Sequence, residues 1–406
     1  MADSLAPTDA DGLADAVRWA VAGERPLEVV AGGSKRRLGR PVQSAASLAL
    51  GAFDGIVDYE PSELVLTAQA ATPLAAIEAA VESERQMLAF EPADYAPLLG
   101  AADAAATLGG ALACNLSGPR RIKAGAARDH FLGVHAVSGR GERFKAGGRV
   151  VKNVTGYDVC KLLAGSYGTL AVMHEVTIKI LPAPERTRTV LVYGLEPGDA
   201  LQALGAALSS AHEVSGAAHM PAEVAARSAV SYVAGAGAAV SAVRIEGFPA
   251  SVAARCEALR DLLGRFGAVE ELHSRNSAAL WREIRDVRAF AADGGPLWRL
   301  SVPPEAGAAA AAQVAGETRA RALFDWGGGL VWLAVDGADD AGEAAVRAAA
   351  AAAGGHATLV RADAPTRAAR AVFQPQATGV AALTARIKRA FDPAGVLNPG
   401  RMYAGV

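Results

Sequence analysis

The chain has 406 residues, of which 51% are hydrophobic and 20% charged, and its formal net charge at pH 7 is −2. A chain of this length exceeds one compact core and indicates two or three domains of an ordinary globular protein. The nearly balanced charge excludes a global attraction to nucleic acid or to an anionic membrane, so any anion-binding site must come from a local cluster of cations.

The cysteines and the N-terminal region narrow the class of protein further. Cys114, Cys160 and Cys256 have no CxxC spacing, which favours reduced thiols over a disulfide framework or a zinc ribbon. The acidic start MADSLAPTDADGL lacks the basic and apolar regions of a secretory signal, and no run of about eighteen strongly apolar residues occurs. We therefore expect a cytoplasmic protein without a transmembrane helix.

The N-terminal part of the chain predicts an α+β pattern. A helix is expected to begin at Asp11 as its cap, and the run 27–31 is a buried strand that leads into a glycine-rich loop. Two more strands are expected at 55–60 and 64–70. Thr72, which precedes a proline, has the character of the N-cap of the next helix.

Glycine is dense between residues 92 and 170, where it alternates with strand-like runs such as 131–137. Such a region is typical of backbone that packs closely against a large ligand. From 190 to 370 the chain is alanine-rich, with helical segments and short strands that indicate a second α+β domain; within it, 305–320 is expected to be a solvent-exposed helix. The stretch 381–402 predicts an amphipathic helix followed by a tail.

The stretch VVAGGSKRRLG at 29–39 combines two glycines, a serine and three cations. It has no GxxxxGK[ST] pattern and is not a Walker A loop, and it lacks the GxGxxG spacing of a Rossmann fingerprint. Its consecutive amides can form an anion nest, with Lys35, Arg36 and Arg37 to add charge. A plain Gly-Gly-Ser turn with solvated cations is the alternative.

Three longer stretches resemble the FAD-binding domain of the p-cresol-methylhydroxylase (PCMH) type, also called the vanillyl-alcohol-oxidase type. They are AATLGGALACNLSGPRRIKAGAARDHFLG (105–133), GGRVVKNVTGYDVCKLLAGSYGTLAVMHEVTIKILP (147–182) and FDPAGVLNPGR (391–401). That family holds the FAD pyrophosphate on an early strand and glycine loop, the flavin ring on a T-x-GG segment, and the adenosine end on a GS-x-GT segment followed by a strand. The resemblance implies an α+β protein with a two-lobed PCMH-type FAD-binding domain and an α+β cap domain.

More specifically, these stretches resemble the FAD-binding subunit of bacterial three-component glycolate oxidases. The resemblance covers roughly 1–182 and 371–406, whereas the middle of the chain matches only at LWRLSVPP (297–304) and DWGGGLVW (325–332). It implies three segments: an FAD-binding domain at 1–185, a cap, substrate or partner domain at 186–370, and a C-terminal segment at 371–406 that returns to the FAD domain.

The resemblance assigns FAD contacts residue by residue. The pyrophosphate loop matches Gly32, Gly33, Ser34 and Lys35, the T-x-GG segment matches Thr107, Gly109 and Gly110, and the adenosine segment matches Gly165, Ser166, Gly168, Thr169 and Val172. Pro92 and Asn398 match positions near the flavin. Each set has a structural alternative, namely close helix packing for the T-x-GG glycines and tight turns for the others. The roles of five further residues stay open between flavin environment and structural ion pairs: Arg128, Asp129, Lys152, Asn153 and Tyr157.

Two departures from the family pattern refine the expectation. Many relatives attach FAD through a histidine in or near the pyrophosphate loop, where this chain has Ser34 and Lys35, so we expect non-covalent FAD. The catalytic D-2-hydroxy-acid dehydrogenases of the superfamily carry an H-x-GDGN segment with a metal and substrate site, which this chain lacks; its nearest stretch is GGHAT at 354–358. We therefore expect no metal site.

The basic stretch PRRIK (119–123) is expected to be a solvated loop or a neighbour of the flavin phosphates, not a nucleic-acid patch.

The leading hypothesis is the FAD-binding subunit of a multi-subunit glycolate (D-2-hydroxy-acid) oxidase, in which a catalytic FAD subunit and an iron–sulfur subunit are partners. Because no cysteine spacing here can bind a cluster, the cluster must lie on another chain. The missing H-x-GDGN segment favours electron relay over primary substrate oxidation, and peripheral attachment of the complex to the inner membrane stays open. The alternatives are a stand-alone FAD-dependent oxidase of another alcohol or sugar acid, and a structural partner that has lost FAD.

Overall fold

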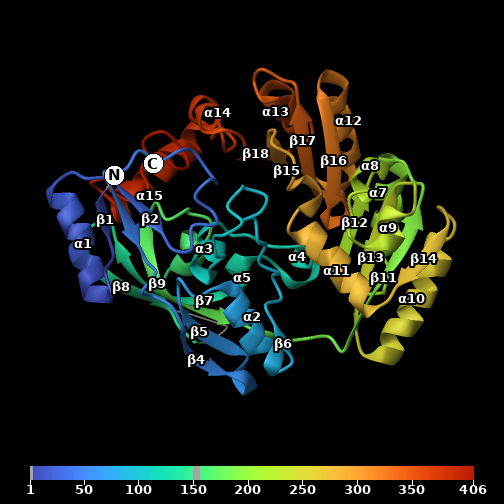
Figure 1. Ribbon diagram of the computed structural model, residues 1–406, viewed down its shortest axis with the longest axis horizontal. Coiled ribbons are helices and arrows are strands. Elements are labelled where there is room, and N and C mark those ends of the chain that lie inside the picture. The colour runs from blue at the N-terminus through green and yellow to red at the C-terminus, as the bar shows by residue number, and fades with distance from the viewer. Residues whose placement is uncertain (1–2, 150–155) are drawn as a thin grey trace. The chain divides into compact units, whose positions relative to one another are not determined.

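The computed structural model describes residues 3–149 and 156–406, and the chain forms two compact units (Figure 1). Unit 1 comprises Met1–Ser117, Ala126–Ala183 and Pro375–Val406, and unit 2 comprises Gly118–Gly125 and Pro184–Gln374. The short segment 118–125 therefore belongs to unit 2, although the sequence pattern groups it with the FAD-binding domain. Lys152 and Asn153 lie outside the described residues.

Unit 1 contains the strands β1 (Asp3–Leu5), β2 (Leu27–Val30), β3 (Ala46–Ala49), β4 (Ile56–Glu60), β5 (Val65–Gln69), β6 (Gln86–Met87), β7 (Phe131–Ser138), β8 (Arg143–Gly147), β9 (Ala171–Lys179) and β10 (Leu181–Pro182). Its helices are α1 (Ala10–Ala22), α2 (Leu74–Ser83), α3 (Leu108–Ala113), α5 (Ala127–His130), α6 (Val159–Leu163) and α15 (Thr378–Phe391), with a 3-10 turn, η1, at Pro61–Glu63. The strands expected near 27–31, 55–60 and 64–70 are present as β2, β4 and β5.

The N-cap of helix α1 lies two residues before the predicted one. Asp9, and not Asp11, is its cap, because the backbone is extended at Asp9 and the side chain accepts a hydrogen bond of 2.8 Å from the Gly12 amide. The helix buries Leu13 and Val17 on one face, as its apolar spacing predicts.

Helix α2 also begins differently, because its N-cap residue is Pro73. The predicted cap, Thr72, instead donates its hydroxyl to the Gln69 carbonyl at 2.7 Å and accepts the Gly55 amide at 2.9 Å. Its side chain therefore closes the loop between β5 and α2.

Unit 1 is built on two principal sheets. The strands β1, β3 and β2 form a three-stranded parallel sheet, and β4, β5, β9, β7 and β8 form a five-stranded antiparallel sheet; β10 and β6 pair separately. The C-terminal segment joins the first sheet, because Leu397 forms a parallel bridge with Leu27 of β2. Val396 and Leu397 are buried in the same apolar cluster as α1 and β3. The two ends of the chain therefore share one core.

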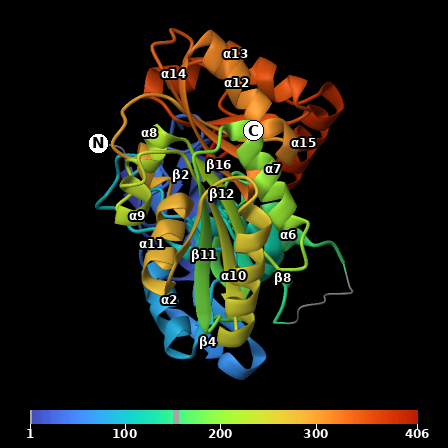
Figure 2. The same cartoon turned by 90° about the vertical axis from the view of Figure 1, so that its right-hand side faces the viewer.

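Unit 2 is an eight-stranded antiparallel sheet with helices on it (Figure 2). In spatial order its strands are β14 (Val269–Leu272), β11 (Arg186–Tyr193), β13 (Val240–Gly247), β12 (Gly216–Met220), β16 (Arg319–Asp325), β17 (Leu330–Asp336), β15 (Leu297–Ser301) and β18 (His356–Arg361). Its helices are α4 (Arg121–Ala124), α7 (Pro197–Leu208), α8 (Ala222–Ala225), α9 (Ser231–Ala234), α10 (Pro249–Leu263), α11 (Ser274–Arg285), α12 (Gly307–Glu317), α13 (Glu343–Ala352) and α14 (Ala364–Ala369), with 3-10 turns η2 (Arg288–Phe290), η3 (Pro304–Ala306) and η4 (Trp326–Gly328).

The alanine-rich run that the sequence places in solvent is α12, and one face of it is buried. Ala310, Ala311 and Val314 are buried where the helix packs against α13, β16 and β17. Small side chains let a helix approach a sheet closely, so an alanine-rich helix is not diagnostic of exposure. The expectation of a solvent-exposed helix is wrong for this face.

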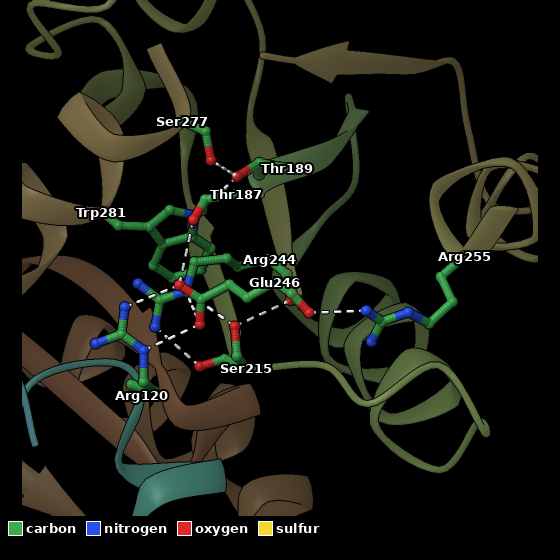
Figure 3. A network of polar contacts seen from close by, with 9 residues as sticks. All are labelled: Arg120, Thr187, Thr189, Ser215, Arg244, Glu246, Arg255, Ser277 and Trp281. Atoms are coloured by element: carbon green, nitrogen blue, oxygen red, sulfur yellow. Dashed lines mark hydrogen bonds and ion pairs between the residues drawn. The ribbon is translucent and has the colours of Figure 1, made fainter. Parts of the chain in front are cut away.

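A buried polar network holds segment 118–125 within unit 2 (Figure 3). Arg120 donates two hydrogen bonds, of 2.9 and 2.8 Å, to the carboxylate of Glu246 on β13. Arg244 on the same strand is buried, donates to the Ser215 hydroxyl at 3.1 Å and stacks over Trp281 at 4.7 Å. Burial alone raises the pKa of Glu246, but Arg244 and Arg120 outweigh it and lower the pKa to about 2.

Candidate functional site: a glycine-lined cleft in unit 1

Unit 1 contains a cleft with an empty volume of about 730 Å³, which includes space open to solvent. Its walls come from the loop after β2, from α3, from the turn before β9, from β9 itself and from the C-terminal segment. Ten of the fourteen residues that the resemblance assigns to FAD line this cleft: Gly32, Gly33, Ser34, Lys35, Thr107, Gly109, Gly110, Gly168, Val172 and Asn398. Segments more than 350 positions apart in the sequence thus meet in one place.

The other four assigned residues do not line the cleft but shape its surroundings. Gly165, Ser166 and Thr169 form the turn before β9, where Gly165 has a φ of +82° and the Thr169 hydroxyl donates to the Ser166 carbonyl at 2.7 Å. Pro92 is buried in the loop before α3. The turn thereby sets the position of Gly168, which does line the cleft.

The loop at 32–35 is compatible only with glycine at its first position. A Cβ on Gly32 would meet the Ala105 carbonyl oxygen at 2.1 Å, and Gly33 has a φ of +80°, a left-handed conformation that glycine adopts without strain. Gly33 also forms a parallel bridge with Ala105, which fixes the loop against the start of the T-x-GG segment. The loop therefore presents its backbone to the cleft.

The three cations of this loop have different roles. Lys35 is buried and lines the cleft, whereas Arg36 and Arg37 are exposed. Arg36 pairs with Glu28, and Arg37 donates to the Leu99 carbonyl at 3.0 Å. Arg36 also borders the cleft, but its guanidinium is paired with Glu28, so Lys35 is the buried cation of the loop at the cleft.

Lys35 is electrostatically unsatisfied. Its ammonium donates one hydrogen bond of 3.2 Å to the Ser34 hydroxyl, and within residues 3–149 and 156–406 no carboxylate lies within salt-bridge distance of it. Burial lowers the pKa of Lys35, and the nearby Cys114 and Asp94 offset this only in part. A buried ammonium with so little compensation is expected where an anion binds.

Helix α3 carries the T-x-GG segment, and its two glycines have different surroundings. Thr107 is the N-cap and accepts the Gly110 amide at 3.3 Å. A Cβ on Gly109 would meet Ala70 atoms at 2.7 Å, so this glycine permits close packing of α3 on the end of β5. A Cβ on Gly110 would lie 3.0 Å from the Thr107 hydroxyl oxygen and 3.7 Å from Cδ of Lys35, so this glycine leaves room beside the cap and the buried lysine. Close packing accounts for Gly109, and both glycines line the cleft.

The C-terminal segment connects two walls of the cleft through Asn398. Its side-chain oxygen accepts the Val29 amide at 2.9 Å, and its side-chain nitrogen donates to the Tyr167 carbonyl at 2.9 Å. Its backbone has a φ of +44°, which asparagine tolerates better than most residues. Asn398 therefore holds β2 and the turn before β9 together.

A buried ion pair near Asn398 adds to the connection between the walls of the cleft. Lys388 of α15 donates hydrogen bonds to Asp392 at 2.7 Å, to the Thr169 carbonyl at 2.7 Å and to the Leu397 carbonyl at 2.9 Å. Asp392 in turn accepts the amides of Val396 and Leu397. We call Lys388, Asp392 and Asn398 the C-terminal clasp.

Among the cleft-lining residues that sequence reasoning missed are four with larger or reactive side chains: Cys114, Tyr167, Met173 and Arg401. Arg401 is buried and donates to the Lys35 and Arg36 carbonyls at 3.0 and 3.2 Å, which leaves the loop amides free of its guanidinium. Burial raises the pKa of the Cys114 thiol, although Lys35 and Arg401 lower it. All four lie inside stretches that carry the family resemblance, and that position is the feature of the sequence from which they could have been predicted.

Three of the residues whose roles were open, Arg128, Asp129 and Tyr157, make local structural contacts or are exposed. The Asp129 carboxylate accepts the Ala126 amide at 2.9 Å and the Arg128 amide donates to Asn115 at 3.0 Å, which are local contacts around α5. Tyr157 is 94% exposed. Neither observation places these side chains at the cleft.

The described residues contain neither a candidate metal site nor a candidate membrane span. No group of three or more His, Cys, Asp and Glu side chains within residues 3–149 and 156–406 could hold a metal ion. In the same residues, none of the helices has the length and apolar character needed to cross a membrane.

The cleft residues fit a long dinucleotide such as FAD. A diphosphate requires cations and backbone amides, which Lys35 and the 32–35 loop supply. Flat rings require apolar walls and close backbone approach, which Val172, Met173 and Gly110 supply. The chemistry of the lining thus matches both ends of the cofactor.

Comparison with known proteins agrees with this assignment. A family model described as an FAD binding domain matches residues 4–147. The glycolate oxidase subunit GlcE of Escherichia coli (strain K12) is 35% identical over 393 residues, which cover 97% of this chain and 97% of the relative. The glycolate oxidase subunit GlcD of Bacillus subtilis (strain 168) is 39% identical over 85 residues, or 21% of this chain and 18% of that one.

Solved structures confirm the fold expected from the sequence. A 4-ethylphenol oxidase from Gulosibacter chungangensis matches with a TM-score of 0.72 and covers 99% of this chain and 89% of its own. A p-cresol methylhydroxylase matches with a TM-score of 0.72 over 98% and 88% of the two chains. Both are 15% identical and therefore show the fold alone. From the identity to GlcE over nearly its whole length, the chain belongs to the family of the glycolate oxidase subunit GlcE and is an FAD-binding oxidoreductase subunit with the PCMH-type fold.

Proposed function

We propose that this chain binds FAD non-covalently in the unit 1 cleft and serves a multi-subunit complex that oxidises glycolate or another small D-2-hydroxy acid. The names of the relatives GlcE and GlcD support the substrate and the existence of more than one subunit. The observation that carries the cofactor assignment is the buried Lys35 ammonium, which lies in a glycine-lined cleft and lacks a carboxylate partner among the described residues.

We assign each part of FAD to a different set of cleft residues. The amides of 32–35 and the Lys35 ammonium hold the diphosphate, and the backbone of α3 at Gly110 lies along the flavin ring. Gly168 and Val172 receive the adenosine end. When bound, FAD accepts the two electrons of an alcohol oxidation and can release them one at a time to a further carrier.

The side chains of the cleft support non-covalent attachment. No histidine is among the cleft-lining residues that the structure describes. Cys114 and Tyr167 are the lining residues there whose side chains could form a bond to the flavin. Burial raises the pKa of Cys114, which suppresses its nucleophilic thiolate.

We further propose that the chain relays electrons to an iron–sulfur subunit and that a separate FAD subunit carries out primary substrate oxidation. The three cysteines of this chain are far apart in sequence, and the described ones are free thiols, so a cluster must be ligated elsewhere. Peripheral attachment of the cytoplasmic complex to the inner membrane is part of this proposal, and cell fractionation with the intact complex tests it.

An absorption spectrum of the purified chain before and after acid precipitation tests the cofactor assignment. We expect flavin bands in the native protein that move to the supernatant on precipitation. Flavin that stays in the pellet would contradict non-covalent attachment, and a Cys114→Ser variant would then identify the linkage. A colourless protein that takes up no added FAD would instead favour a structural partner without cofactor.

The partner assignment needs a separate experiment. We expect affinity purification of the tagged chain from its native cells to recover an iron-containing, cysteine-rich polypeptide and a second flavoprotein. A chain that purifies alone and oxidises glycolate with a dye acceptor would instead be a stand-alone oxidase.

A further inference from the structure

One corner of the unit 2 sheet carries an unusual group of polar side chains on β15 and β18. Arg299 lies directly opposite Thr358, and Ser301 lies directly opposite His356, so these four side chains share one face of the sheet. The neighbouring Trp298 points to the other face, where its indole donates to the Ala341 carbonyl at 2.8 Å. The four residues are therefore on the face that α13 does not cover.

The same face extends across the sheet to the buried network of Figure 3. Residues that lie directly opposite each other on neighbouring strands have side chains on the same face of the sheet. Such pairs are Arg299 and Trp332 on β15 and β17, Trp332 and Leu323 on β17 and β16, and Gly216 and Arg244 on β12 and β13. This is the face on which segment 118–125 lies, because Arg120 of that segment binds Glu246 two residues from Arg244 on β13. Segment 118–125 thus brings cations to the face that holds Arg299.

Two guanidinium groups meet on one indole at this corner. The Arg121 guanidinium carbon lies 4.5 Å from the ring centre of Trp326, and the Arg299 carbon lies 5.2 Å from it. The Trp326 indole is fixed by a hydrogen bond of 3.2 Å to the Gly118 carbonyl. Stacking on a fixed ring orients the planar guanidinium of Arg299 and leaves its N–H edge available to a ligand.

Arg299 stands apart from the other partly buried arginines of unit 2. Arg321 pairs with Asp293 and Asp336, and Arg361 donates to the Gly295 carbonyl at 2.9 Å. Within the described part of the chain, the half-buried Arg299 has the Trp326 stacking contact but neither a carboxylate nor a carbonyl acceptor. A guanidinium held near a second cation without an acceptor is costly unless an anion joins them.

The neighbouring side chains can complete such a site. Burial lowers the pKa of His356, and the charges of Arg299 and Arg121 lower it further, so this imidazole is neutral and can either donate or accept. Thr358 and Ser301 add hydroxyls at adjacent cross-strand positions. The corner therefore offers cations for a carboxylate and neutral groups for an adjacent hydroxyl or carbonyl.

Three sequence stretches converge here, none of which the FAD cleft uses. Arg299 and Ser301 come from LWRLSVPP, Trp326 comes from DWGGGLVW, and Arg121 comes from PRRIK. The first two are the stretches of the middle domain that resemble the family, and the third was expected to be a solvated loop or a neighbour of flavin phosphates. Its arginines instead bind Glu246 and stack on Trp326 within unit 2.

We propose that the Arg299 corner, defined as Arg121, Arg299, Ser301, Trp326, His356 and Thr358, binds the carboxylate of a small 2-hydroxy or 2-oxo acid. The carboxylate accepts a two-point hydrogen bond from the Arg299 fork, and the oxygen on the neighbouring carbon bonds to the hydroxyl and imidazole groups. This inference rests on the proposed function for the choice of acid, but it assigns a ligand site to the chain outside the FAD cleft.

Calorimetric titration of the FAD-loaded full chain with sodium glycolate, at constant ionic strength, tests the site. We expect saturable binding that Arg299→Gln weakens at least tenfold and that Arg299→Lys, which keeps the charge but loses the fork, weakens by a smaller factor. Arg275→Gln, which removes an exposed charge from α11 of the same unit, is the matched control and is expected to leave the affinity unchanged. Flavin content and the unfolding midpoint are recorded for each variant.

The outcomes are distinguishable. Absence of glycolate binding by the wild-type chain, equal binding by Arg299→Gln, or equal competition by sulfate would overturn the carboxylate site. Equal competition by sulfate would indicate a general anion site. Binding of an acidic protein without binding of glycolate would also count against the carboxylate site. A chain that binds glycolate through Arg299 but takes up no FAD would refute the cofactor proposal and leave this one standing.

Discussion

The ammonium of Lys388 lies 2.7 Å from the carbonyl oxygen of Thr169, although 219 positions separate the two residues in the sequence. This bond fixes the turn before β9 to the end of α15. Because Gly168 lines the cleft beside that turn, the C-terminal clasp determines the position of one wall of the cofactor site.

Lys388→Met is expected to destabilise unit 1 and to lower its flavin content. The substitution leaves the buried Asp392 carboxylate without its cation, a change that typically costs about 3–5 kcal/mol of unfolding free energy. Urea denaturation and flavin absorbance per chain measure the two effects. Lys161→Met breaks a half-exposed pair of the same unit and is the control, with an expected cost below about 1 kcal/mol. Equal losses for both variants would refute the role of the clasp.

Lys35→Met is expected to weaken FAD binding at least tenfold while the apoprotein becomes no less stable. The ammonium is buried with one weak hydrogen bond, so its removal abolishes a desolvation cost in the apoprotein and a phosphate contact in the holoprotein. Titration of the apoprotein with FAD, followed by flavin fluorescence, measures the affinity. A variant that loses stability and affinity together would indicate a structural lysine.

The pH dependence of FAD binding gives an independent test of Lys35. Burial lowers the pKa of this lysine in the apoprotein, so it loses its proton at a lower pH than an ordinary lysine does. Phosphate requires the protonated form. The FAD dissociation constant is therefore expected to rise as the pH rises through that lowered pKa, and Lys35→Met should remove the rise.

Gly32→Ala is expected to abolish FAD binding. The added methyl would lie 2.1 Å from the Ala105 carbonyl oxygen, so the loop at 32–35 must move away from the start of α3. Gly379→Ala is the matched control, since a Cβ there meets nothing within 4 Å and the residue lies in α15, where alanine is the better helix former by about 1 kcal/mol. Flavin content after gentle purification distinguishes the two, and a yellow Gly32→Ala protein would contradict the assignment of the loop.

Alkylation of Cys114 is expected to be slowed by FAD. Burial raises the pKa of all three thiols, to about 12 for Cys160 and about 11 for Cys256, so the thiols differ mainly in access. Cys160 and Cys256 are buried, whereas Cys114 is partly exposed and lines the cleft. Mass spectrometry after iodoacetamide treatment of the apoprotein should find the label mainly on Cys114, and saturating FAD should suppress it. Unchanged labelling would place the cofactor elsewhere.

The sequence predicted the segments of the site better than it predicted the direction of the side chains. Resemblance to a family identified the loop at 32–35, the segment at 107–110 and the tail at 391–401, because short glycine and asparagine patterns persist where backbone must turn sharply. It could not indicate that Lys35 is buried at the cleft while the Arg36 guanidinium pairs with Glu28, since that depends on the left-handed conformation at Gly33 and on the position of Glu28.

The second domain was less predictable for a related reason. Segment 118–125 has an ordinary basic sequence, and only its pairing with Glu246, more than a hundred positions away, assigns it to unit 2. The group around Arg299 also arises from cross-strand register, which a single sequence does not encode in any local pattern. Contacts between distant segments decide both features.

The division of the chain into interleaved segments has a consequence for biosynthesis. Unit 2 has all of its residues once position 374 leaves the ribosome, whereas unit 1 still lacks Pro375–Val406, which contains α15 and the residues bonded to Thr169 and Val29. Domains usually fold as they emerge, from the N-terminus onward. Here the first half of the chain must wait for residues 375–406 to complete unit 1, so we expect flavin uptake to follow the synthesis of that segment.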